Sequence, residues 1–143
     1  MKKTIFMTAL LALVSVMAFG QAGEGVKFEK GTLKEALAKA GKENKLVFVD
    51  VYAVWCGPCQ YMAGKVFPQK AVGDYFNANF VNIKFDAEKG EGIDIARQYG
   101  VTGYPTFLLL NDEGYELGRI VGGGTADQFI AKVKEKVAEI EKK

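Results

Sequence analysis

The sequence predicts an α/β domain in which helices cover both faces of a mixed central sheet. Strand-like and helix-like segments alternate through most of the chain, which favours parallel strands joined by crossover helices. Residues 46–51 are apolar at odd and even positions alike, as expected of a strand covered on both faces. Two strand-like segments nearer the C-terminus flank a short polar turn, which adds an antiparallel pair.

The chain begins with the features of a secretory signal peptide. Met1-Lys2-Lys3 is basic, residues 5–18 are almost entirely apolar, and small residues follow around Gly20. As a helix, the apolar stretch would span roughly 21 Å, less than the roughly 30 Å of hydrocarbon that an uncleaved anchor must cross. We therefore predict a signal peptide over residues 1–20, with cleavage as late as residue 22, and a periplasmic or secreted protein. An uncleaved anchor is the alternative.

Residues 21–143 have the length of one domain with one core. Lys2 and Lys3 would leave with the signal peptide, so 19 basic residues would become 17, equal to the 17 acidic residues. Without net charge or a basic cluster, we expect no nucleic-acid binding. We also expect a monomer. Gly122-Gly123-Gly124 lacks the sequence context of a phosphate loop, so we predict a turn there and no cofactor.

The predicted strands share apolar, β-branched or aromatic side chains between turn signals. They are residues 26–29, 46–51, 80–85, 106–110 and 115–121, with residues 111–114 as the turn of the final hairpin. Asp50 is the sole polar residue in its strand. A carboxylate in such a strand is expected only where it is paired or functional, although an edge position or a capping role would also account for it.

The predicted helices place apolar residues three and four positions apart. Thr32 and Glu35 have the spacing of a capping box, and we expect Gly41 to end the helix that starts there. The remaining helices run from Cys59 through Val66 with a kink or restart at Pro68, then over residues 72–76, 93–99 before Gly100, and 126–140.

The motif Trp55-Cys56-Gly57-Pro58-Cys59 contains both cysteines of the chain and follows the apolar strand 46–51. A thiol between a strand and a helix faces free backbone N–H groups, which favour the reactive thiolate. A second cysteine about one helical turn later can close a disulfide with the first. Pro58 suits a first helical turn, where its missing N–H is not needed. The motif therefore predicts a redox pair.

A structural zinc site is the main alternative for two cysteines at this spacing. A closed zinc site needs four cysteine or histidine ligands, and the sequence has two cysteines and no histidine. Such a site would require a second chain. We therefore predict no metal site.

Over roughly residues 26–140, the chain resembles the thioredoxin family. Its five-residue motif is identical to the family's active-site motif, and Gly103-Tyr104-Pro105-Thr106 resembles a second signature in which a cis-proline precedes a strand. Asp50 stands at the position of the family's buried aspartate. Residues 62–79 are more similar to exported thioredoxin-like domains that accept electrons from membrane reductases. The resemblance implies a thioredoxin fold and protein-disulfide oxidoreductase activity.

The resemblance also implies roles for individual residues. Cys56 would be the nucleophile, Cys59 the resolving cysteine and Asp50 a buried proton acceptor. The residues expected to contact substrate are Trp55, Gly57, Pro58, Tyr104 and Pro105. Simple packing of Trp55 and an incidental surface position of Tyr104 are the alternatives.

Two positions depart from the family pattern. A lysine is expected near the buried aspartate, and the sequence suggests Asn82 there, with Lys84 two residues further on the same strand face. Tyr104 stands before the proline, where the family commonly has threonine or a β-branched aliphatic residue. Both positions influence cysteine acidity or substrate access.

Three functions remain open at this point. The first is an exported reductant of protein disulfides that receives electrons from a membrane thiol reductase. Gly57-Pro58 favours it, because this pair resembles that of reducing thioredoxins, whose potential is about −270 mV. The second is a disulfide oxidant or isomerase, and the third is a non-catalytic peptide-binding module.

Overall fold

Strand β1 (Leu46–Tyr52) lies inside a four-stranded sheet of order β2-β1-β3-β4. The structure is a computed structural model that describes residues 24–143, so the predicted signal peptide lies outside the described residues. Strand β1 pairs in parallel with β2 (Phe80–Asp86) and antiparallel with β3 (Thr106–Leu110). Strand β4 (Glu116–Val121) completes the predicted hairpin with β3. The predicted mixed sheet is confirmed.

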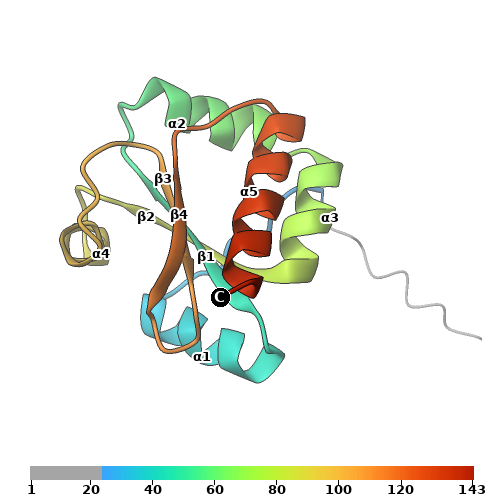
Figure 1. Ribbon diagram of the computed structural model, residues 1–143. Coiled ribbons are helices and arrows are strands. Elements are labelled where there is room, and N and C mark those ends of the chain that lie inside the picture. Colours follow the sequence, from blue (N-terminus) through green and yellow to red (C-terminus); the bar gives the residue numbers. More distant parts are fainter. Residues whose placement is uncertain (1–23) are drawn as a thin grey trace, which may run out of the picture.

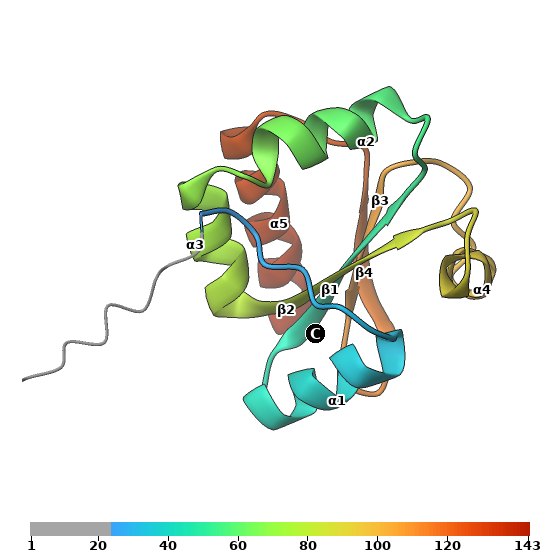
Figure 2. The same ribbon diagram turned by 180° about the vertical axis from the view of Figure 1, so that it is seen from behind.

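Helices cover both faces of this sheet (Figures 1 and 2). Helices α1 (Leu33–Glu43) and α4 (Glu91–Gln98) pack on one face, where aliphatic residues dominate the core. Helices α3 (Lys70–Asn79) and α5 (Ala126–Glu141) pack on the other, where the core is rich in phenylalanine. The ring centroid of Phe48 in β1 lies 4.7 Å from that of Phe76 and 5.5 Å from that of Phe107. These rings anchor the centre of the sheet.

Two predictions near the start of the domain are wrong. Residues 26–29 do not form a strand, because they make a single parallel bridge from Phe28 to Asn82. The backbone N–H of Val26 donates instead to the Phe67 carbonyl, 2.8 Å away. Helix α1 begins with the predicted capping box but continues past Gly41 to Asn44, which adopts a left-handed φ of 54°. Asparagine tolerates that conformation, so it can end the helix in place of glycine.

The helix that follows the cysteines has two parts. Helix α2 (Gly57–Tyr61) leads directly into a π-helical turn, η1 (Met62–Val66), and the chain restarts as α3 after Pro68. The predicted restart is confirmed, whereas the π-turn had no signal in the sequence. Among residues 24–143, no helix combines the length and apolar character needed to cross a bilayer.

Candidate active site

The two cysteines form a disulfide at the junction of the β1 segment with α2, and their Cα atoms are 5.2 Å apart. Cys56 is the N-cap of α2, and its Sγ accepts a hydrogen bond from the Cys59 backbone N–H at 3.2 Å. A donor at this position favours negative charge on the Cys56 sulfur once the disulfide is opened. Both residues are largely enclosed, with 4% of Cys56 and 6% of Cys59 exposed.

Aromatic residues lie on the outer side of this disulfide. The Trp55 side chain is exposed over 66% of its surface, and its indole N–H donates to the Glu88 carboxylate. Its ring meets that of Tyr104 edge to face, with the centroids 5.9 Å apart. Tyr104 also packs against the cysteines, and the Tyr104–Pro105 peptide is cis, as the resemblance implies. The structure thus brings the predicted contact residues together, while the Glu88 contact had no signal in the sequence.

Asp50 lies on the inner side of the cysteines, in the interior strand β1. It is 5% exposed, and its Oδ1 has no hydrogen-bond partner among the described residues. These facts exclude the alternative of an edge position in water. A cavity of about 180 Å³ is lined by both Asp50 and Cys59. Burial raises the pKa of Asp50 to about 7, and the positive charge of Lys84 partly opposes this rise.

The lysine that accompanies Asp50 is Lys84, so the assignment of Asn82 to that position is wrong. Lys84 is the register partner of Asp50 in the parallel pair of β1 with β2, whereas Asn82 is paired with Phe48. Lys84 also lines the Asp50 cavity. The sequence placed both candidates on the same strand face, and only the register of the two strands distinguishes them.

Gly122-Gly123-Gly124 follows β4 and passes close to the active site. The Gly122 N–H donates to the carbonyl of Pro105 at 2.9 Å. A Cβ built on Gly123 would lie 2.7 Å from the sulfur of Met62, which is buried in η1. This approach explains a glycine there and agrees with the predicted turn. Within residues 24–143, no three cysteine, histidine or acidic side chains gather as metal ligands.

A disulfide at the start of a helix, beside an exposed aromatic surface and in front of a buried acid, is suited to exchange with other thiols. These features define the class of thiol–disulfide oxidoreductases. The thioredoxin family model matches residues 25–135, so the chain belongs to the thioredoxin family. The predicted fold and the predicted class of enzyme, a protein-disulfide oxidoreductase, are therefore confirmed.

Several known proteins are similar to this chain. A thioredoxin of Echinococcus granulosus is 34% identical over 92 residues, which cover 64% of this chain and 79% of that protein. The match covers a smaller share of the length of some other curated thioredoxins. For the chloroplastic thioredoxin Y1 of Arabidopsis thaliana this share is 50%. A solved Bacteroides thetaiotaomicron protein, described as a "putative disulphide-isomerase", is 44% identical with a TM-score of 0.71, covering 80% of this chain and 95% of that chain.

Proposed function

We propose that this protein reduces disulfides of other proteins outside the cytoplasm, using the dithiol form of Cys56 and Cys59. The observation that carries the proposal is the arrangement of the two sulfurs. Cys56 Sγ receives a backbone N–H that stabilises a thiolate, whereas Cys59 lines a cavity with an unpartnered carboxyl group. One cysteine is thus suited to attack, and the other to be deprotonated when the intermediate must be resolved.

The reaction begins with attack of the Cys56 thiolate on one sulfur of the substrate disulfide. The substrate S–S bond breaks, one substrate thiolate leaves and takes a proton from water, and a mixed disulfide forms with Cys56. Asp50 then accepts the proton of Cys59, whose thiolate attacks Cys56 Sγ. The second substrate sulfur leaves as a thiolate and is protonated. The substrate has gained two electrons, and the protein has been oxidised to the Cys56–Cys59 disulfide.

The substrate is expected to lie across the outer side of the disulfide. Trp55 and Tyr104 offer an aromatic surface there, and nothing lies within 4 Å of a Cβ built on Gly57. Together with Pro58 and Pro105, these residues would contact an extended peptide around the reacting sulfur.

A membrane thiol reductase would return the disulfide to its dithiol form by supplying electrons. The protein would act as a monomer. Structural similarity supports a thiol-redox partner, because the oxidised C-terminal domain of DsbD from Neisseria meningitidis is 28% identical with a TM-score of 0.61. That match covers 78% of this chain and 99% of that one. The signal-peptide features of residues 1–20 support the compartment. Isomerase activity is the second candidate, favoured by the similarity to the Bacteroides protein.

Reduction of insulin disulfides with dithiothreitol as electron source tests the proposal. The wild type should accelerate the reaction, and a Cys56→Ser/Cys59→Ser double variant should not. Equal rates would point to a peptide-binding module.

Equilibration with glutathione should give a potential of about −220 to −270 mV, and a value above about −150 mV would instead indicate an oxidant. Reactivation of scrambled ribonuclease measures isomerase activity, and a Cys59→Ser variant in cells would trap substrates on Cys56.

A further inference from the structure

Two aromatic rings surround the ammonium group of Lys84. Its Nζ lies 5.2 Å from the ring centroid of Phe28 and 5.9 Å from that of Tyr52. Both distances are within the range in which a cation is attracted to the face of an aromatic ring. Phe28 belongs to the segment before α1, and Tyr52 ends β1. Residues from two separate parts of the chain therefore hold the same cation.

Lys84 also stands where two cavities meet. The cavity of about 180 Å³ that contains Asp50 and Cys59 is lined by Lys84 and Ala63. A second cavity, of about 280 Å³, is lined by the same two residues and by Phe28. Lys84 therefore borders both the cavity of Asp50 and the one beside it. The same side chain supplies the positive charge that lowers the pKa of Asp50.

We propose that Phe28 and Tyr52 are positioning residues, whose rings hold the Lys84 ammonium at the mouth of the Asp50 cavity and thereby control proton transfer between Cys59 and Asp50. The inference rests on the proposed function, because it assumes that Asp50 serves Cys59. Both rings act through Lys84. Tyr52 also packs against the cluster that contains Cys56 and Cys59, so Phe28 is the ring that tests the effect on Lys84 by itself.

The other groups around Asp50 leave Lys84 as the cation that matters. Tyr52 faces the cavity from β1 and Cys59 from α2, while η1 contributes only Ala63. The partner of Asp50 on β3 is Phe107, which carries no charge. Glu24 lines the outer cavity beside Lys84, and Asp86 acts on Tyr52. Since Lys84 lowers the pKa of Asp50 against the effect of burial, release of Lys84 toward Glu24 and water should raise that pKa.

The test compares Phe28→Leu, which removes the ring face, with Phe28→Tyr, which keeps it. The Asp50 pKa is measured by NMR titration of protein with ¹³C-labelled aspartate carboxyl groups. Phe28→Leu should raise this pKa by about 0.5, because a released Lys84 ammonium attracts the Asp50 carboxylate less, and Phe28→Tyr should leave it unchanged. The pH midpoint of insulin reduction should move upward in parallel in Phe28→Leu.

A Lys84→Met background separates this mechanism from simple packing. Phe28 also meets Phe67 edge to face at 5.2 Å, so the leucine variant alters the core as well. If the ring acts through Lys84, Phe28→Leu has no further effect on the Asp50 pKa once Lys84 is methionine. An equal change in both backgrounds, or no change in either, would overturn the proposal. If Phe28→Leu does not fold, Tyr52→Leu against Tyr52→Phe provides the same comparison.

Failure of this proposal is distinguishable from failure of the proposed function. The NMR titration needs no turnover, and it reports on Asp50 whether or not the protein reduces insulin. A wild type that reduces insulin, with an Asp50 pKa that ignores Phe28 and Tyr52, would refute the positioning role alone. A wild type that does not reduce insulin would refute the proposed function.

Discussion

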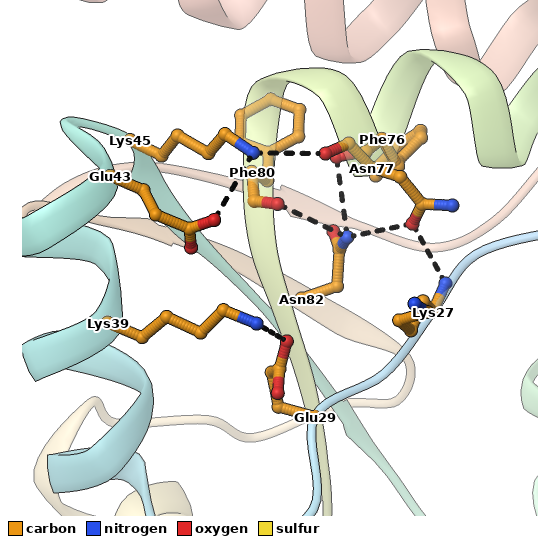
Figure 3. A network of polar contacts seen from close by, with 9 residues as sticks. All are labelled: Lys27, Glu29, Lys39, Glu43, Lys45, Phe76, Asn77, Phe80 and Asn82. Carbon is orange, nitrogen blue, oxygen red and sulfur yellow. Dashed lines mark hydrogen bonds and ion pairs between the residues drawn. The ribbon is translucent and has the colours of Figure 1, made fainter. Parts of the chain in front are cut away.

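Asp50 and Asn82 are buried polar residues on neighbouring strands, and in each one side-chain oxygen has no hydrogen-bond partner among the described residues. Their surroundings differ. The Asn82 amide donates weakly to the Phe76 carbonyl at 3.3 Å and to Asn77 Oδ1 at 3.4 Å, within a network of lysines, acids and backbone groups (Figure 3). Asp50 faces a cavity that contains a cysteine.

The cavity beside Asn82 is larger than the cavity beside Asp50, although it contains no redox-active group. Asn82 lines a cavity of about 440 Å³ between α1 and α3, which neither cysteine lines. Two lysines that line this cavity form ion pairs, Lys39 with Glu29 and Lys45 with Glu43. An amide cannot change its charge near neutral pH, whereas a carboxyl group with a pKa of about 7 can. The reactive end of the sheet is therefore identified by a titratable group close to a cysteine, and not by the size of the cavity.

The largest expected effect comes from giving the Asn82 site a charge. Asn82→Asp would place a carboxyl group next to the Phe76 and Phe80 carbonyls, in a position that is 2% exposed. We predict that the variant loses about 3 kcal/mol of unfolding free energy at pH 8, and less at pH 4, where the new group is protonated. Urea denaturation at both pH values measures this. Wild-type stability at pH 8 would show that water reaches the site.

The converse change, Asp50→Asn, should stabilise the protein at high pH. The pKa of Asp50 is raised to about 7 from 3.8, so the unfolded chain releases this proton first and stability falls as pH rises between these values. Above pH 7 the cost is constant. We predict that Asp50→Asn gains about 2 kcal/mol at pH 8, after allowance for its own buried amide, and little at pH 4. Urea unfolding of both proteins across this pH range measures the difference. A wild-type free energy of unfolding that does not fall as the pH rises would contradict the prediction.

Activity, unlike stability, should depend on Asp50 and hardly on Asn82. At pH 7 we predict that Asp50→Asn reduces insulin about 10-fold more slowly, because Cys59 loses its proton acceptor. Its rate should also lack the inflection near pH 7 that we expect of the wild type from the pKa of Asp50. Asn82→Ala is the matched control, since it removes a buried polar group away from the sulfurs and should stay within about twofold once the folded fraction is considered. Equal losses in both variants would mean that Asp50 only supports the fold.

The smallest expected effect concerns the two sulfurs themselves. In the reduced protein, Cys56 should react with iodoacetamide about fivefold faster than Cys59 at pH 7, because Cys56 Sγ accepts the backbone N–H at the start of α2. Peptide mass spectrometry at short reaction times measures both rates. Asp50→Asn should leave the Cys56 rate unchanged. Equal rates for the two thiols would remove the basis for their different roles.

The sequence by itself determined the local features of this protein. The capping box at Thr32, the strand at 106–110 and the helix that opens at the cysteines depend on side chains a few residues apart, so their signals are complete in the sequence. Asp50 was identified because a lone carboxylate contradicts an apolar strand, and its burial agrees with that inference. The thioredoxin family was evident from one motif and a distant proline.

Only the tertiary structure decided which distant residues meet. The alternation of a strand assigns each side chain to a face but not to a partner, so the choice of Lys84 over Asn82 required the register of β1 with β2. Trp55 bonds to Glu88, 33 positions away, and Phe28 reaches Lys84 from a segment that makes a single bridge. Such contacts depend on the tertiary packing of elements that are distant in the sequence. The residue pattern within one element does not contain that information.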